Sequence, residues 1–162
     1  INDDRSPAWP QGYVGSITHT KGFAAAIASR STEYLALGID TEEIVDQPTV
    51  ERLRHSIMTA SETEMLLTPP ATMSAATFFT FIFSAKESIY KCLRPLVGQF
   101  FGFKSAHLLN VAASPETDYG TACFHVDPLG NTTDPEVATI DVRWLLSDGY
   151  VHTATALRPA QS

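Results

Sequence analysis

The sequence predicts an α+β protein, because runs of strand length lie toward both ends of the chain and helical patterns fill the middle. The 162 residues are 44% hydrophobic and 18% charged, a composition with which a chain of this length can bury a core. The longest apolar run, residues 78–83, is far shorter than the ~20 residues of a membrane span. We therefore expect a soluble protein, folded as one domain or as two small lobes.

Three short strands are expected first. Prolines and a glycine make residues 5–12 an extended segment that leads into the first strand. The Lys-Gly pair at 21–22 predicts a hairpin turn between strands at 15–20 and 23–29. Residues 34–40 form a third apolar strand.

The middle of the chain is expected to be helical. After an Asp-Gln-Pro break, residues 49–59 form a helical pattern, and Ser61 with Glu64 has the spacing of a capping box. The longest helix is expected over residues 71–96, ending before Gly98.

The remainder of the chain is expected to be β structure. Strands are predicted at residues 105–113, 119–126, 139–146 and 150–157, from apolar or alternating patterns. A Ser-Asp-Gly turn connects the last two as a hairpin.

Charge and cysteine content exclude several classes of protein. The formal net charge of −7 argues against a nucleic-acid-binding surface, so an anionic ligand must be met locally. A short basic cluster is available for this, made up of Lys86, Lys91, Arg94 and Lys104. Cys92 and Cys123 are too few for a disulfide framework and lack metal-ligand spacing, which favours free thiols in a reducing cytoplasm.

Acidic residues in two separate segments are candidate metal ligands. Asp40 and Glu42 are two residues apart, so they project to the same side if the strand continues through them. A solvated acidic turn would explain that pair alone. With Glu87 from a helix, however, three oxygen ligands describe an incomplete Mg²⁺ shell that substrate phosphate and water would finish. A surface ion pair of Glu87 with Lys91 is the alternative.

The long helix separates its charged residues onto two faces. Glu87, Lys91 and Arg94 follow i, i+4 and i+7 spacing and share one face. Lys86 instead falls on the apolar line of the helix, so its ammonium group needs an anionic partner.

Ser16 and His19, which follow Gly15, are candidate donors to an anion. A lone histidine at a strand end is more often structural, and Arg5 in the preceding loop is more often a solvated charge. The order of residues does not match a Ser-His-Asp hydrolase triad.

Three sequence blocks occur in one order along the chain. They are Gly-Ser-Ile-Thr-His at 15–19, Gly-Ile-Asp-Thr-Glu at 38–42 and Phe-Ser-Ala-Lys-Glu-Ser-Ile-Tyr-Lys at 83–91. Together they resemble the 4′-phosphopantetheinyl transferase superfamily, over about residues 5–106. Trp9-Pro, with Gly12 just before the first block, resembles the subgroup that includes the enterobactin synthetase component D enzymes of siderophore assembly.

The resemblance implies an enzyme that transfers phosphopantetheine from coenzyme A to a serine of an acyl, peptidyl or aryl carrier protein, releasing adenosine 3′,5′-bisphosphate. Asp40, Glu42 and Glu87 would hold Mg²⁺. Glu87, directly or through a water, would accept the serine proton, and Lys91 would stabilise the departing phosphate.

The resemblance also implies contacts to coenzyme A. Lys86 and Lys91 would contact its pyrophosphate, and Ser16 and His19 would lie near its 3′-phosphate, with Arg5 a further contact to the nucleotide. A transmembrane segment and a nucleic-acid partner are not expected.

Larger members of this family are pseudo-dimers of two α+β lobes with coenzyme A between them. We expect residues 34–162 to form the C-terminal lobe with the metal site, and residues 1–33 to be the end of an N-terminal lobe whose beginning is absent. Apolar residues after the long helix would either dock the carrier protein or belong to the core, namely Leu96, Val97, Phe100, Phe101 and Phe103.

Two other functions use the same residues. A metal-dependent phosphohydrolase would use the acids without a carrier protein. A non-catalytic coenzyme A-binding or truncated partner protein would bind without turnover.

Overall fold

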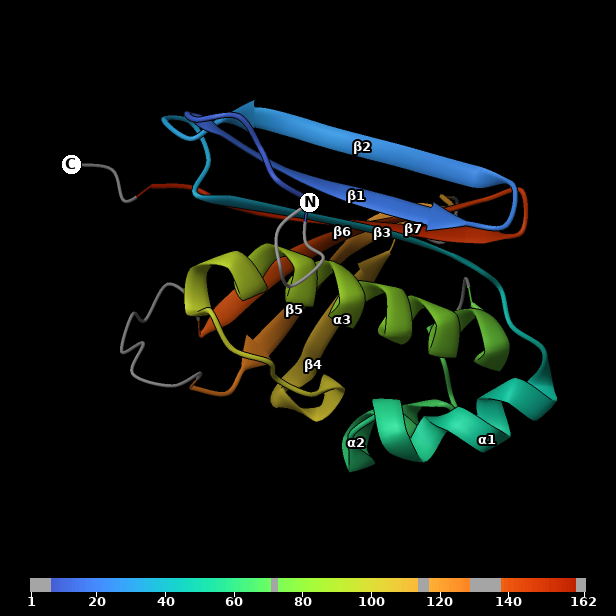
Figure 1. Ribbon diagram of the computed structural model, residues 1–162. Helices are drawn as coiled ribbons and strands as arrows, with labels where there is room; N and C mark the ends of the chain where they lie inside the picture. The colour runs from blue at the N-terminus through green and yellow to red at the C-terminus, as the bar shows by residue number, and fades with distance from the viewer. Residues whose placement is uncertain (1–6, 71–72, 114–116, 129–137, 160–162) are drawn as a thin grey trace.

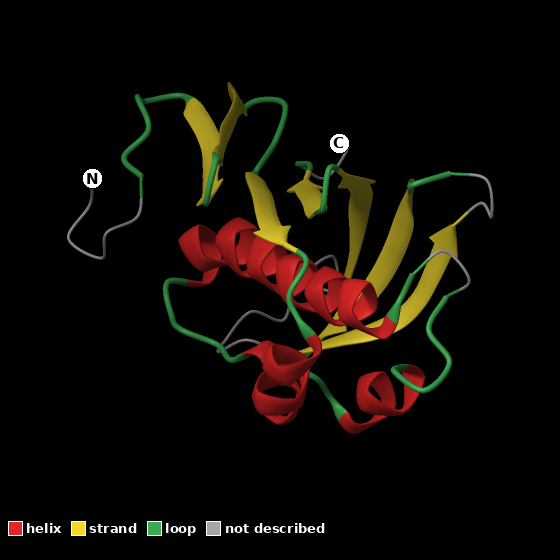
Figure 2. Ribbon diagram, turned by 90° about the vertical axis from the view of Figure 1, so that its right-hand side faces the viewer, coloured by secondary structure: helices red, strands yellow, loops and turns green. Residues whose placement is uncertain are grey.

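The structure is a computed structural model that describes residues 7–70, 73–113, 117–128 and 138–159. It confirms the predicted α+β class, with a long helix across a five-stranded sheet and a two-stranded hairpin beside that sheet (Figure 1). The hairpin and the two short helices lie on opposite sides of the long helix (Figure 2). In the described part of the chain, no helix is long and apolar enough to cross a membrane.

The large sheet is antiparallel and has the strand order β3-β7-β6-β5-β4. Its strands are β3 (Ala36–Glu43), β4 (Ala106–Ala113), β5 (Tyr119–Val126), β6 (Thr139–Ser147) and β7 (Tyr150–Leu157). The predicted turn between β6 and β7 is confirmed, and Asp148 and Gly149 in it both have positive φ. Strand β3 continues to its end through Asp40 and Glu42, so these acids lie in the strand and not in a turn after it.

The long helix α3 (Ala75–Val97) buries its apolar side against the sheet. It begins after Ser74, whose Oγ accepts a hydrogen bond from the Thr77 N–H at 3.1 Å, and it ends at Gly98 in the left-handed conformation. This start is later than the predicted residue 71, and residues 71–72 lie outside the described ones. The fully buried side chains of α3 include Phe78, Phe79, Phe81, Ile82, Ile89 and Leu93.

Helix α3 approaches strand β3 closely at Gly38. A Cβ atom at this position would overlap the carbonyl oxygen of Ser88 and the side chain of Cys92, so only glycine fits. Because Asp40 follows two residues later, this close approach brings its carboxylate against the middle of α3.

The hairpin consists of β1 (Tyr13–Thr20) and β2 (Phe23–Arg30), joined as predicted at Gly22, which has positive φ. Its tip is attached to β7, because the Tyr150 hydroxyl donates a hydrogen bond to the Lys21 carbonyl at 2.9 Å. The hairpin therefore passes over β3 to reach the neighbouring strand (Figure 1).

Hydroxyl groups of β1 satisfy the free edge of β3. Ser16 Oγ accepts a hydrogen bond from the Ile39 N–H at 3.0 Å, and Thr18 Oγ1 accepts one from the Thr41 N–H at 2.9 Å. The Thr41 hydroxyl in turn lies 3.0 Å from His152 Nδ1 on β7. The segment that carries Asp40 and Glu42 is thus fixed from both sides.

Two short helices complete the structure, α1 (Gln47–Ile57) and α2 (Ala60–Met65). The predicted capping box of Ser61 with Glu64 is wrong. Helix α2 begins after Thr59, so Thr59 and Glu62 form the capping box instead. This shift directs the Glu62 side chain back toward the chain between the two helices.

Candidate active site

A lysine and an acid from different elements are in direct contact at the junction of β3 and α3. Lys91 Nζ lies 2.7 Å from Asp40 Oδ1. The second oxygen of Asp40, Oδ2, is buried and has no hydrogen-bond partner among the described residues. Because a buried carboxylate oxygen normally has a partner, this atom is a position that a ligand would complete.

Glu42 and Glu87 add two further carboxylates to the same place. Burial raises the pKa of Glu42 to about 7, and repulsion from Asp40 and then Glu87 adds to the effect against a lowering by Lys91. Burial, followed by Asp40, also raises the pKa of Glu87. The three carboxylates therefore crowd around Lys91 and make a local excess of negative charge.

These carboxylates fit a hard divalent cation. Mg²⁺ prefers oxygen ligands and usually retains several waters, so a few carboxylates with substrate phosphate suffice to bind it. No three such side chains of the described residues are already arranged as a metal cage. The fit rests on the unpartnered oxygen of Asp40 and on the pKa values of Glu42 and Glu87, which burial and then the neighbouring carboxylates raise.

A cavity of about 550 Å³ lies next to this cluster, between β1, β3 and the second half of α3. Its walls include Trp9, Val14, Ile17, Leu37, Tyr90 and Pro95, and its described charged residues are Lys91 and Arg94. The volume is within the usual range for a small-molecule site. An apolar cavity with cations on one wall suits an anionic molecule with a flat, apolar part.

A smaller hollow of about 80 Å³ shares a lining residue, Tyr90, with the large cavity. Glu87 lines the small hollow together with aromatic residues of the segment after α3. Lys91 and Glu87 thus face adjoining spaces, and one ligand could extend through both.

The comparisons with known proteins identify the family. Residues 36–150 match the 4′-phosphopantetheinyl transferase superfamily, and residues 1–29 match the 4′-phosphopantetheinyl transferase N-terminal domain. The chain belongs to the 4′-phosphopantetheinyl transferase superfamily. This confirms the family that the three sequence blocks indicated, whereas the division into lobes at 1–33 and 34–162 stays a prediction.

Three relatives show how much of a phosphopantetheinyl transferase the chain covers. It is 36% identical to 4′-phosphopantetheinyl transferase Npt of Nocardia iowensis, over 93% of this chain and 68% of the relative. It is 31% identical to 4′-phosphopantetheinyl transferase PptT of Mycobacterium tuberculosis, over 96% and 66%. It is 33% identical to enterobactin synthase component D of Salmonella typhimurium, over 94% and 59%. The match to enterobactin synthase component D supports the predicted subgroup.

Four of the residues predicted for a phosphopantetheinyl transferase site lie together in the structure. They are Asp40, Glu42, Glu87 and Lys91. Their roles in catalysis and metal binding stay predictions.

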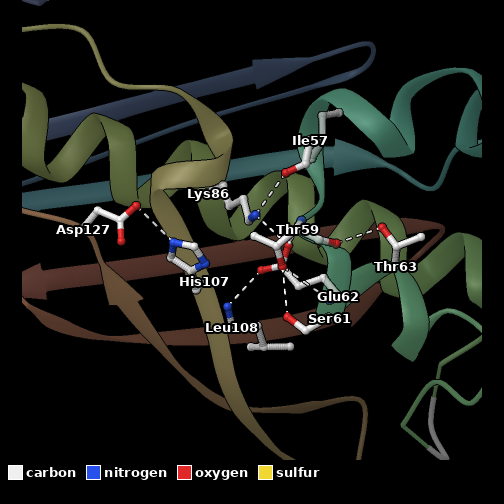
Figure 3. A network of polar contacts seen from close by, with 9 residues as sticks. All are labelled: Ile57, Thr59, Ser61, Glu62, Thr63, Lys86, His107, Leu108 and Asp127. Carbon is white, nitrogen blue, oxygen red and sulfur yellow. Dashed lines mark hydrogen bonds and ion pairs between the residues drawn. The ribbon is translucent and has the colours of Figure 1, made fainter.

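Lys86, which was predicted to contact pyrophosphate, lines the small hollow, but its ammonium group is directed to Glu62 (Figure 3). Its ammonium group is buried, 2.7 Å from Glu62 Oε2 and 3.0 Å from the Ile57 carbonyl oxygen. The anion that Lys86 needs is thus supplied by a carboxylate of the protein, and its contact with pyrophosphate stays a prediction. Sequence reasoning required an anion for Lys86 but missed Glu62, because the capping box was assigned to the wrong pair.

The three predicted nucleotide contacts differ in where they lie relative to the large cavity. Ser16 lines the large cavity, but its hydroxyl already accepts the Ile39 N–H. His19 is exposed on β1 and does not line this cavity. Arg5 lies outside the described residues.

The apolar residues at the end of α3 and after it also differ, in their exposure to solvent. Phe100 is 78% exposed and Leu96 is 45% exposed, as a docking surface would require. Val97, Phe101 and Phe103 pack against the core, as the alternative interpretation proposed.

Proposed function

We propose that this chain transfers the 4′-phosphopantetheine arm of coenzyme A to a serine of an apo-carrier protein, with Mg²⁺ held by Asp40, Glu42 and Glu87. The observation that carries this function is the position of the carboxylate cluster and Lys91 between an apolar cavity and a second, aromatic hollow. Coenzyme A has matching parts: a nucleotide, a pyrophosphate and a long neutral arm.

In this arrangement the nucleotide lies in the large cavity and the arm extends past Tyr90 into the small hollow. The pyrophosphate is then next to Lys91, whose ammonium group exchanges part of its contact with Asp40 for phosphate oxygens. His19, at the other end of the carboxylate cluster, is a proposed contact for the 3′-phosphate.

The reaction is a displacement at phosphorus. The serine oxygen bonds to the phosphorus that carries the arm, the bond from that phosphorus to the bridging oxygen breaks, and adenosine 3′,5′-bisphosphate leaves. The serine proton passes to Glu87, directly or through a water, and burial, which raises the pKa of Glu87, makes its carboxylate a stronger base. Lys91 stabilises the charge on the departing phosphate, and Mg²⁺ when bound supplies further positive charge to the pyrophosphate.

The carrier protein remains to be identified. The match to enterobactin synthase component D makes carrier domains of siderophore assembly the first group to test. The exposed Phe100, which lines the small hollow, and the exposed Leu96 form the proposed docking surface. A cytoplasmic location, where such carriers and coenzyme A are found, stays part of this proposal.

The test is incubation with coenzyme A, Mg²⁺ and a panel of apo-carrier proteins, followed by intact-mass measurement of each carrier. We expect one carrier to gain a single phosphopantetheine group with this chain and with Glu43→Gln, an exposed acid beside the site, but not with Glu87→Gln. Coenzyme A binding without any mass gain would identify a non-catalytic binding protein. Consumption of coenzyme A without a carrier would identify a phosphohydrolase.

A further inference from the structure

We infer that His107, His125 and Asp127 form a second metal site, which takes a divalent transition-metal ion such as Zn²⁺. His107 lies on β4, His125 lies on β5, and Asp127 directly follows β5. The site is separate from the candidate active site, and the inference does not rest on the proposed function.

The backbone of the large sheet places the three side chains on one face. His107 and His125 are paired across β4 and β5, and such opposite residues have Cβ atoms about 4.5–5.5 Å apart. Asp127 is two residues after His125, and its N–H donates a hydrogen bond to the Ser105 carbonyl at 2.8 Å, which continues the ladder. Because side chains alternate along a strand, all three point away from the face of the buried Phe124, whose ring packs against α3.

Both imidazole rings have Nε2 near the same carboxylate. His107 Nε2 lies 3.1 Å from Asp127 Oδ2 (Figure 3), and His125 Nε2 lies 3.9 Å from Asp127 Oδ1. Two ligand atoms of a tetrahedral zinc ion are about 3.3 Å apart, since each lies about 2.0–2.2 Å from the metal. Among the described residues, no three such side chains already stand at full metal-binding spacing. His125 is therefore the ligand that moves inward when the ion binds.

The types of donor atom select the class of metal. Imidazole nitrogen with carboxylate oxygen suits zinc and its neighbours among the transition metals, whereas Mg²⁺ and Ca²⁺ prefer oxygen ligands throughout. Three protein ligands leave a fourth position for water. The three side chains are 38%, 43% and 51% exposed, so an ion can reach them from solvent. As surface ion pairs alone, these contacts would contribute little to stability.

The position in the sheet separates this site from the carboxylate cluster around Lys91. Strands β4 and β5 are at one end of the strand order and β3 is at the other. Asp40 of β3 contacts α3 through Lys91, whereas the histidines lie on the face away from α3. A metal ion bound at one place therefore does not share ligands with an ion bound at the other.

The first test follows the imidazole nitrogens of the whole chain in ¹H–¹⁵N NMR spectra during titration with Zn²⁺, with Mg²⁺ in excess. We expect the Nε2 signals of His107 and His125 to shift together with one dissociation constant. The signals of His55, which is exposed on α1, should not follow them. The parent protein alone can thus support or refute the site.

The second test measures calorimetric Zn²⁺ dissociation constants for variants under the same conditions. His107→Ala and His125→Ala should each weaken binding by at least about 10-fold, because loss of even an outer-shell partner of a metal commonly costs that much. His55→Ala is the matched loss of an exposed imidazole. Cys123→Ser removes the thiol two residues before His125, on the same face. These two variants should bind Zn²⁺ within about 3-fold of the parent.

Three results would overturn the inference. The first is the absence of a shift of either imidazole at millimolar Zn²⁺. The second is unchanged Zn²⁺ binding in His107→Ala or His125→Ala. The third is loss of Zn²⁺ binding in Cys123→Ser or in Asp40→Asn, which would place the ion at the thiol or at the carboxylate cluster.

Discussion

Helix α3 carries two lysines that each contact a carboxylate at 2.7 Å, and the two pairs differ in burial and in how fully their carboxylate oxygens are hydrogen-bonded. Lys86 pairs with Glu62 and Lys91 pairs with Asp40, five residues further along the helix. The difference lies in what surrounds each pair, and it separates a structural contact from a site prepared for a ligand.

The Lys86–Glu62 pair is complete (Figure 3). Glu62 Oε1 accepts the Leu108 N–H at 2.9 Å, and Oε2 accepts the Thr59 N–H at 2.8 Å as well as the ammonium group. Both side chains are almost fully buried. The pair therefore joins α3 to β4 and to the chain between α1 and α2, and both of its carboxylate oxygens have partners within the protein.

The Lys91–Asp40 pair is incomplete. The lysine side chain is 29% exposed, and one oxygen of Asp40 has no partner among the described residues. Glu42 and Glu87 crowd the same lysine, and their pKa values are raised. Additional positive charge and hydrogen-bonding groups from a ligand would relieve this arrangement.

The largest expected effect is on the complete pair. Glu62→Gln leaves the Lys86 charge buried without a carboxylate, and this should lower the free energy of unfolding by about 3–5 kcal/mol. The measurement is urea unfolding, compared with Glu51→Gln, which breaks an exposed ion pair with Arg54 on α1.

A double variant refines this test. Adding Lys86→Met to Glu62→Gln removes the uncompensated charge, so the double variant should be more stable than Glu62→Gln alone. If Glu62→Gln lowers the free energy of unfolding no more than Glu51→Gln does, the Lys86–Glu62 pair does not stabilise the fold.

Loss of the carboxylate charge from the Lys91–Asp40 pair should not lower the free energy of unfolding. Asp40→Asn removes one of three crowded carboxylates, and Lys91 keeps Glu42 and Glu87 beside it, so the free energy of unfolding should be unchanged or slightly raised. Transfer to a carrier should fall by at least about 100-fold, because a negatively charged oxygen ligand is lost at the proposed metal site. Near-normal turnover of Asp40→Asn at low Mg²⁺ would show that the three-carboxylate site is wrong.

The sequence predicted the incomplete site better than the complete one, for a physical reason. Asp40, Glu42, Glu87 and Lys91 lie in short blocks whose spacing on a strand and on a helix defines their direction. The structure adds what spacing cannot give, namely the glycine at 38 that lets α3 approach β3. Most strands and α3 were also predictable, since their patterns are local.

Glu62 was not predictable in the same way, because its carboxylate has partners from three separate segments of the chain. The structural contact of Ser16 was not predictable for a similar reason. Its Oγ accepts the Ile39 N–H at the edge of β3, and its proposed donation to an anion stays a prediction. A contact between an edge strand and a side chain depends on tertiary packing, which residue patterns do not contain.

The smallest expected effect is the dependence of stability on pH at Glu42. Its pKa is 4.5 in an ordinary environment and about 7 in the folded protein. Between these values the folded state binds more protons than the unfolded chain, so the free energy of unfolding falls as pH rises. We expect this contribution to be about 1 kcal/mol, because the side chain is partly exposed and solvent screens it.

The measurement is urea unfolding of this chain and of Glu42→Gln at pH 5.5 and pH 8, with and without Mg²⁺. The lowered pKa of His152, caused mainly by burial, gives a slope of opposite sign below its ordinary value of 6.5, but both proteins share it. The difference between the two proteins therefore isolates Glu42. On the proposed function, Mg²⁺ binds the ionised carboxylates, so it should stabilise the parent more at pH 8 than at pH 5.5, and Glu42→Gln should reduce that gain. If parent and variant show the same pH profile, Glu42 titrates normally and the crowding that distinguishes the incomplete pair is absent.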